Sequence, residues 1–189
     1  MKVFALGGYG KVGFPGIKLL AQSDLVTEIA IVGRSLERAE KAAAEIGEKG
    51  IVAHADGSDE QKLTSLLAGY DIIMNAADNK VVLPSIRAAI HNGVHYCDVA
   101  WGSVLEEALQ LASEAEAAGI TSIVANGISP GISNLMGVHV ARQLEEVEQL
   151  QIGRAEIFNF QSGRELIPRQ WLEDPEESLA ALHEFRPFI

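Results

Sequence analysis

Cysteine is nearly absent from this sequence of 189 residues, in which Cys97 is the single example. One thiol cannot form a disulfide within the chain, and it cannot build a metal centre from cysteine ligands. Cys97 lies in the apolar stretch VHYCDVA, where a buried, unreactive thiol is a simpler interpretation than a nucleophile. The five histidines show no metal-ligand spacing, so the sequence predicts no metal site.

Long hydrophobic runs and an excess of positive charge are also missing. The apolar stretches are too short for the core of a signal peptide or for a membrane span, so we expect a cytoplasmic protein without membrane contact. The chain has 26 acidic and 15 basic residues, a formal net charge of −11. This balance argues against nucleic acid as a partner. Hydrophobic residues make up 48% of the chain, enough for the core of one ordinary domain.

Short apolar runs alternate with amphipathic stretches over the first two thirds of the chain. Strands are expected at residues 2–6, 29–32, 51–55, 71–75, 94–99 and 120–125. Helices are expected between them, including one capped by Ser35, one opened by the capping-box pair Ser58 and Gln61, and one unbroken helix over 104–118. Because the runs are apolar on both faces, they predict an α/β fold of the Rossmann type, with a doubly wound parallel sheet.

The stretch GGYGKVG follows the first expected strand directly and opens the first expected helix. Its glycines have the spacing of a dinucleotide-binding turn, in which they permit a tight turn, admit a pyrophosphate and let the helix pack on the strand. Backbone N–H groups at the start of the helix would bind the phosphates. The alternative is a tight strand–helix turn without a ligand. The predicted cofactor-binding residues here are Gly8, Tyr9, Gly10, Lys11, Val12 and Gly13.

The end of the second expected strand indicates which dinucleotide would bind. A carboxylate about twenty residues beyond the glycines would hold the ribose hydroxyls of NAD, but Arg34 and Ser35 stand there. Both residues suit a ribose 2′-phosphate, so the sequence predicts NADP in preference to NAD. Alternatively, Arg34 is a solvated loop residue and Ser35 only a helix cap.

Two other strand ends complete the predicted cofactor site. Asp56 follows the third expected strand, where an adenine would lie, although it is equally well explained as a turn residue in DGSD. Asn75, Ala76 and Ala77 end the fourth, on the expected path of the cofactor phosphates and ribose.

A short-chain dehydrogenase is a second interpretation of the glycines, since Gly7, Gly10 and Gly13 also fit the spacing GxxGxxG. Those enzymes transfer protons with a Tyr-x-x-x-Lys pair. None of Tyr9, Tyr70 and Tyr96 has a lysine four residues later, which excludes that catalytic pair.

Five stretches together resemble the saccharopine dehydrogenase family, in its saccharopine reductase-like branch: GGYGKVG, IVGRSLERAEKAA, DIIMNAA, AAIHNGVHYCDVA and GISPGISNLMG. The resemblance covers residues 2–140 and implies an NAD(P)-dependent oxidoreductase that transfers hydride at a carbon–nitrogen bond of an amino-acid-derived substrate. The pattern of alternating elements changes after about residue 150, which places a domain boundary near 148–151. The resemblance identifies 1–148 as an NAD(P)-binding domain and 149–189 as a fragment of an α+β substrate domain that also serves dimerisation.

The resemblance also points to residues on the substrate side, namely Tyr96, Asp98, Trp101 and Asn134, without identifying a catalytic residue. Asp98 would orient an amine or a water, or else it is a helix N-cap or a turn residue. Asn134 would equally well cap a helix.

Two functions therefore remain open. The first is the oxidoreductase, and the second is a non-catalytic NADP-binding module that acts as a redox sensor or subunit. An exposed edge strand expected at 156–160 predicts a homodimer.

Overall fold

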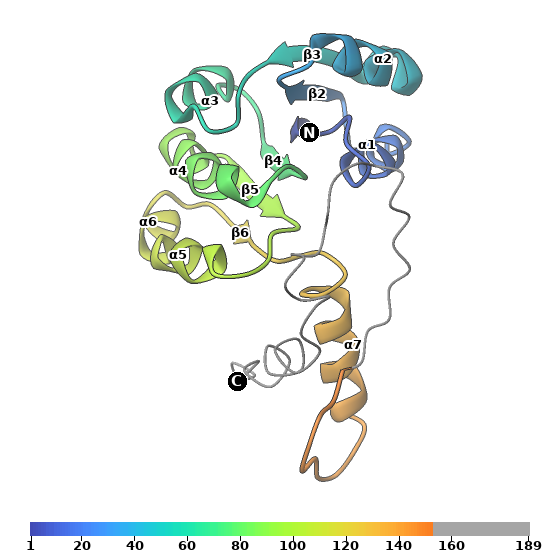
Figure 1. Cartoon of the computed structure of the whole chain (residues 1–189), viewed down its shortest axis with the longest axis vertical. Coiled ribbons are helices and arrows are strands. Elements are labelled where there is room, and N and C mark those ends of the chain that lie inside the picture. The colour runs from blue at the N-terminus through green and yellow to red at the C-terminus, as the bar shows by residue number, and fades with distance from the viewer. Residues whose placement is uncertain (153–189) are drawn as a thin grey trace, which may run out of the picture. The chain divides into compact units, whose positions relative to one another are not determined.

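The computed structural model describes residues 1–152 and has one parallel sheet with helices on both of its faces (Figure 1). The chain divides into a unit of residues 1–152 and a second unit of residues 153–189, and only the first is described. The predicted edge strand at 156–160 and most of the predicted segment 149–189 lie outside the described residues. The boundary at residue 148 stays a prediction.

The sheet has six strands in the order β3-β2-β1-β4-β5-β6, as predicted for a Rossmann-type α/β fold. The chain first builds outward from β1 through β2 to β3, and then returns to the other side of β1 to build β4, β5 and β6. This reversal leaves a crevice outside the carboxyl ends of β1 and β4, where ligands bind in such sheets. The strands are β1 (Lys2–Leu6), β2 (Glu28–Gly33), β3 (Gly50–His54), β4 (Ile72–Asn75), β5 (His95–Asp98) and β6 (Ser122–Ile123).

Alternation along the strands divides the hydrophobic core between the two faces of the sheet. Val3 and Ala5 of β1 belong to one buried cluster together with residues of α1 (Gly13–Ala21) and α2 (Leu36–Ile46). Phe4 and Leu6 point to the opposite face and belong to the cluster beneath the remaining sheet-covering helices. Those helices are α3 (Glu60–Leu66), α4 (Val82–Asn92), α5 (Val104–Gln110) and α6 (Ala112–Ala117).

Three local expectations differ from the structure. Asp59, not Ser58, caps α3, because the Ser58 hydroxyl instead donates to Asp56 at 2.8 Å. The helix expected over 104–118 is interrupted at Leu111, where α5 ends and α6 begins. The last strand is shorter than expected, with β6 limited to Ser122–Ile123. Ser35 does cap α2, as predicted, by accepting from the Arg38 N–H at 3.4 Å.

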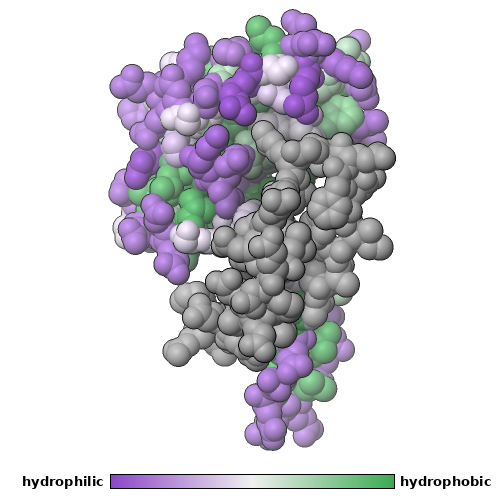
Figure 2. Space-filling view, in the orientation of Figure 1, coloured by the Kyte–Doolittle hydropathy of each residue, from purple (hydrophilic) through white to green (hydrophobic). Residues whose placement is uncertain are grey.

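Beyond the sheet, the chain forms α7 (Ile132–Ala141), whose apolar side chains are largely exposed within the described part of the molecule. Figure 2 shows these hydrophobic residues interspersed with polar ones at the lower end of the view. Across residues 1–152, no helix combines the length and apolarity that a bilayer crossing requires.

Candidate functional site

The glycine turn between β1 and α1 lies directly against the chain that follows β4. Gly7 has φ +74°, which favours glycine, and its N–H donates to the Val32 carbonyl of β2 at 2.8 Å. A Cβ on Gly7 would lie 3.0 Å from the carbonyl atoms of Ala76. A Cβ on Gly13 would collide with the Gly7 carbonyl oxygen, so the start of α1 approaches the turn as closely as backbone allows.

Unpaired backbone donors converge on this crevice. Gly10 and Phe14 use their N–H groups to close the turn, with bonds of 2.8 Å to Gly7 and 2.9 Å to Gly10. The intervening N–H groups of Lys11, Val12 and Gly13 have no acceptor among residues 1–152. Because these groups lie at the positive end of the α1 dipole, they form a site for an anion such as a phosphate. The residues present therefore fit a dinucleotide pyrophosphate.

Arg34 and Ser35, the residues predicted to bind the ribose 2′-phosphate, follow β2. Arg34 is exposed, whereas Ser35 serves as the cap of α2, one of the two roles considered for it. Asp56 lies at the same edge and accepts from both the N–H and the hydroxyl of Ser58, at 3.0 and 2.8 Å. These two bonds are the main reason that the pKa of Asp56 is lowered, with smaller contributions from the charges of Arg34 and Lys80. Asp56 is thus a charged turn residue facing two cations.

A buried polar network joins the ends of β4 and β5. The Asn75 side-chain amide donates to the Tyr96 hydroxyl at 2.9 Å, and that hydroxyl donates to Asp98 at 2.9 Å. Asn75 and Asp98 are direct neighbours in the β4–β5 pairing, which places all of these groups at one level of the sheet. Burial, followed by the charge of Asp98, raises the pKa of Tyr96 far above its ordinary value, so its hydroxyl stays protonated.

This network also holds the backbone on both sides of the crevice. Asp98 accepts from the N–H groups of Ala100 and Ala125 at 3.0 and 2.8 Å, and Asn75 accepts from Ala77 at 3.0 Å. Asp98 is only 3% exposed. Asp98 therefore acts as a turn residue, holding the loops that follow β5 and β6. Asn75 positions Ala77 beside the glycine turn.

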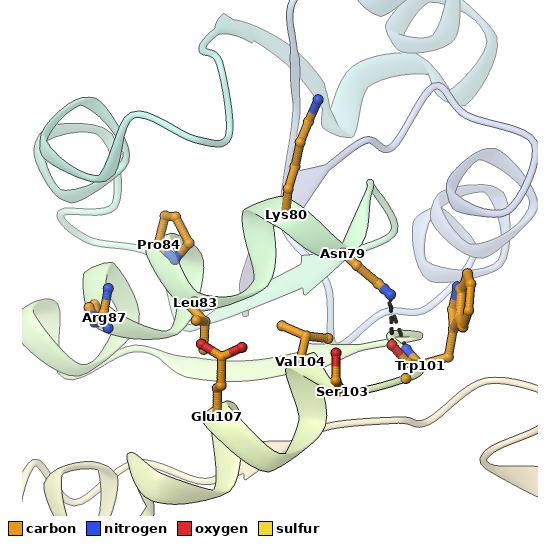
Figure 3. Close-up of a pocket in the computed structure, with 10 residues that line it drawn as sticks. Asn79, Lys80, Leu83, Pro84, Arg87, Trp101, Ser103, Val104 and Glu107 are labelled. Atoms are coloured by element: carbon orange, nitrogen blue, oxygen red, sulfur yellow. Dashed lines mark hydrogen bonds between the residues drawn. The ribbon is translucent and has the colours of Figure 1, made fainter.

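A groove opens between the start of α4 and the loop that follows β5 (Figure 3). It has a volume of about 430 Å³. Asn79 closes one end, because its side chain donates to the Trp101 carbonyl at 2.6 Å and accepts from the Trp101 N–H at 3.4 Å. Arg87 and Glu107 line the other end (Figure 3). Trp101, predicted on the substrate side, is 52% exposed at the rim.

Asn134 lies away from this arrangement, in the first turn of α7. Its side-chain oxygen accepts from the Gly131 N–H at 3.1 Å, which caps the helix. Helix capping is the alternative to substrate contact that was expected for Asn134 from the sequence. Among residues 1–152, no group of three or more His, Cys, Asp or Glu side chains comes together as a metal site would require.

Two residues with a defined place at the site were not predicted, Asn79 and Arg38. Asn79 follows the fourth strand within the segment DNK, and its bond to Trp101 joins residues 22 positions apart in the sequence. Arg38 lies in the first turn of α2 and contacts Tyr9, from which 29 residues separate it. The only available signal was its position three residues after the predicted cap Ser35.

Comparison with known proteins agrees with this geometry. Residues 3–123 match the family described as the saccharopine dehydrogenase NADP binding domain. The saccharopine dehydrogenase (L-Glu forming) of Saccharomyces cerevisiae has a similar structure, with a TM-score of 0.66 and 26% identity over 75% of this chain and 31% of the yeast chain. The protein Pen of Bacillus thuringiensis shares the fold, with a TM-score of 0.53 and 16% identity over 65% of this chain and 49% of its own. The match thus spans about a third of the yeast enzyme.

Proposed function

We propose that this chain, which belongs to the saccharopine dehydrogenase NADP-binding domain family, holds NADPH for hydride transfer at a carbon–nitrogen bond of an amino-acid-derived substrate. Family membership and the yeast neighbour support an NAD(P)-dependent oxidoreductase, with NADP as its cofactor. The substrate and the direction of transfer are our proposal.

The glycine turn carries this proposal. Three successive N–H groups, those of Lys11, Val12 and Gly13, are free at the start of α1. They lie at the edge where the strand order reverses, beside the backbone of Ala76. Every helix leaves its first N–H groups unpaired, so what favours a ligand here is where this helix begins, at the reversal of the strand order and behind a turn whose glycines let a phosphate approach the backbone.

Each side of the crevice has a distinct task in this proposal. The start of α1 binds the pyrophosphate, and the network of Asn75, Tyr96 and Asp98 fixes the loops after β4, β5 and β6 around the rest of the cofactor. The nicotinamide supplies the hydride when it is bound. The groove beyond Asn79 supports an amino-acid-like substrate, because Glu107 suits an ammonium group and Arg87, whose exposed ion pair with Glu60 is long at 3.9 Å, can turn to a carboxylate.

Two linked measurements test the proposal. NADPH binding is followed by calorimetry, and turnover by loss of NADPH absorbance when amino acids are supplied together with keto acids or aldehydes. We expect both binding and turnover. Binding without turnover on any such pair would overturn the hydride-transfer proposal and leave the cofactor site standing.

A non-catalytic NADP-binding module is the second candidate, and the buried network favours it. Tyr96 and Asp98, the titratable side chains predicted on the substrate side, bond to each other and are 1% and 3% exposed. Neither is available to a substrate in this arrangement. A module would bind NADPH and change its association with a partner chain on binding, whereas the oxidoreductase consumes the cofactor.

A further inference from the structure

Tyr9, the aromatic residue inside the glycine turn, reaches across to the end of β2. A Cβ on Gly33 would lie 2.7 Å from Cε1 and Cζ of the Tyr9 ring, so the ring occupies space that any larger residue at position 33 would need. The Tyr9 hydroxyl accepts from the Ser35 N–H at 3.2 Å. These contacts fix the ring beside Arg34 and Ser35, the residues predicted to bind the ribose 2′-phosphate.

Arg38 is held on Tyr9 by two separate contacts. Its guanidinium carbon lies 4.7 Å from the centre of the Tyr9 ring, within the range of a cation–π interaction. One terminal nitrogen of Arg38 also donates to the Tyr9 carbonyl oxygen at 3.3 Å. A planar guanidinium carries five N–H donors, so most of them remain available to a ligand.

Arg38 forms no ion pair with the residues that the structure describes. Among residues 1–152, the ion pairs are those of Lys2 with Glu28 and Arg87 with Glu60, and Arg38 takes part in neither. Arg34 follows β2 directly but donates no hydrogen bond within residues 1–152, and its charge acts on Asp56. The Arg38 side chain is thus held in one orientation, whereas no hydrogen bond among the described residues holds the Arg34 side chain.

We infer that Arg38, positioned by Tyr9, discriminates NADPH from NADH by binding the ribose 2′-phosphate, with Arg34 in a secondary role. This rests on the proposed cofactor function and names the residues that give it specificity. A preorganised guanidinium loses less freedom when it binds a phosphate, because Tyr9 already holds it. Tyr9 is a positioning residue, which acts through Arg38.

The test compares affinities for NADPH and NADH by calorimetry in wild type and in the variants R38Q, R34Q, Y9L and Y9F. A charge-assisted bond to phosphate predicts that R38Q weakens NADPH binding about tenfold to a hundredfold and leaves NADH binding unchanged. R34Q should have a smaller effect. Y9L should lower the preference in the same direction as R38Q, and Y9F, which keeps the ring, should retain most of it. K41Q removes a charge from the same helix and serves as the control.

A smaller probe separates this inference from the proposed function. Adenosine 2′,5′-bisphosphate and 5′-AMP differ at the 2′-phosphate and contain no nicotinamide. We expect R38Q to abolish the preference for the bisphosphate. If wild type prefers NADPH and R38Q preserves that preference, or if R34Q alone removes it, the inference is wrong and the cofactor function stands. If folded wild type binds neither dinucleotide, the proposed function itself fails.

Discussion

The hydroxyl of Tyr96 donates a hydrogen bond of 2.9 Å to the carboxylate of Asp98, two positions further along β5. Both side chains point to the same face of the strand, where the Asn75 amide completes the network from β4. Among the described residues, no buried side-chain nitrogen or oxygen lacks a partner. The loops that enclose the cofactor crevice therefore depend on one satisfied polar cluster.

Removing the Tyr96 hydroxyl should destabilise the domain. Y96F leaves the Asn75 amide without its acceptor and removes the Tyr96 donor from Asp98, one of its three, which we expect to lower the free energy of unfolding by about 1–3 kcal/mol. Urea denaturation measures the change. Y70F is the matched control, because Tyr70 is only partly buried and packs its ring edge on Phe4. Equal, negligible losses in both variants would contradict the structural role of the network.

Alkaline pH should weaken the fold. Burial is the largest cause of the raised pKa values of Tyr96, Tyr70 and Cys97, whose ordinary values are 10.0, 10.0 and 9.0. The unfolded chain releases these protons at a lower pH than the folded chain, so the stability is full below those ordinary values and falls as pH rises above them. Denaturation midpoints measured from neutral pH to about pH 10.5 should decline above about pH 9. Midpoints that stay level, or an equally steep decline in Y96F, would count against this account.

Cys97 should react slowly with thiol reagents in the native state. Burial, and next the charge of Asp98, raises the pKa of its thiol, so little thiolate is present near neutral pH. The rate of reaction with a chromogenic disulfide, followed spectroscopically, should rise strongly when urea unfolds the chain. A native rate equal to that of the unfolded chain would show that Cys97 is a reactive thiol.

Alanine substitutions of Gly13 and Gly16 in α1 distinguish two effects on stability, the clash of a new Cβ with the glycine turn and the higher helix propensity of alanine. In G13A the new Cβ meets the Gly7 carbonyl oxygen, and we expect a loss of about 1–3 kcal/mol in stability together with weaker NADPH binding. In G16A the Cβ would lie 3.5 Å from Met74 Sδ, an ordinary contact, so the helix should gain up to about 1 kcal/mol. Denaturation and calorimetry on both variants test this contrast, which equal effects would refute.

The sheet could be predicted from the sequence because the buried strands are short apolar runs with glycine close by, as in EIAIVG and GVHYCD. It was harder to predict which of two neighbouring polar side chains caps a helix. The Ser58 hydroxyl bonds to Asp56, which leaves the capping of α3 to Asp59. No helix-breaking residue marks the interruption at Leu111.

The parts of the site that escaped prediction are contacts between distant segments. Tyr9 meets Gly33 and Arg38 only because β1 and β2 pair in one register and bring the glycine turn beside the start of α2. The alternation of side chains along a strand predicts to which face of the sheet each one points, but it does not predict the contacts made by the loops that follow the strand. For the same reason, Asp98 could be placed at a strand end while its bond to the Ala125 N–H could not.

The most direct test of the central claim is a calorimetric titration of the wild-type chain with NADPH and, separately, with NADH. Free N–H groups at the start of α1, and the guanidinium of Arg38 held on Tyr9 at the start of α2, predict that both bind and that NADPH binds more tightly. Tighter binding of NADH would contradict the assignment of the 2′-phosphate site. Absence of binding by either dinucleotide to the folded chain would contradict the account as a whole.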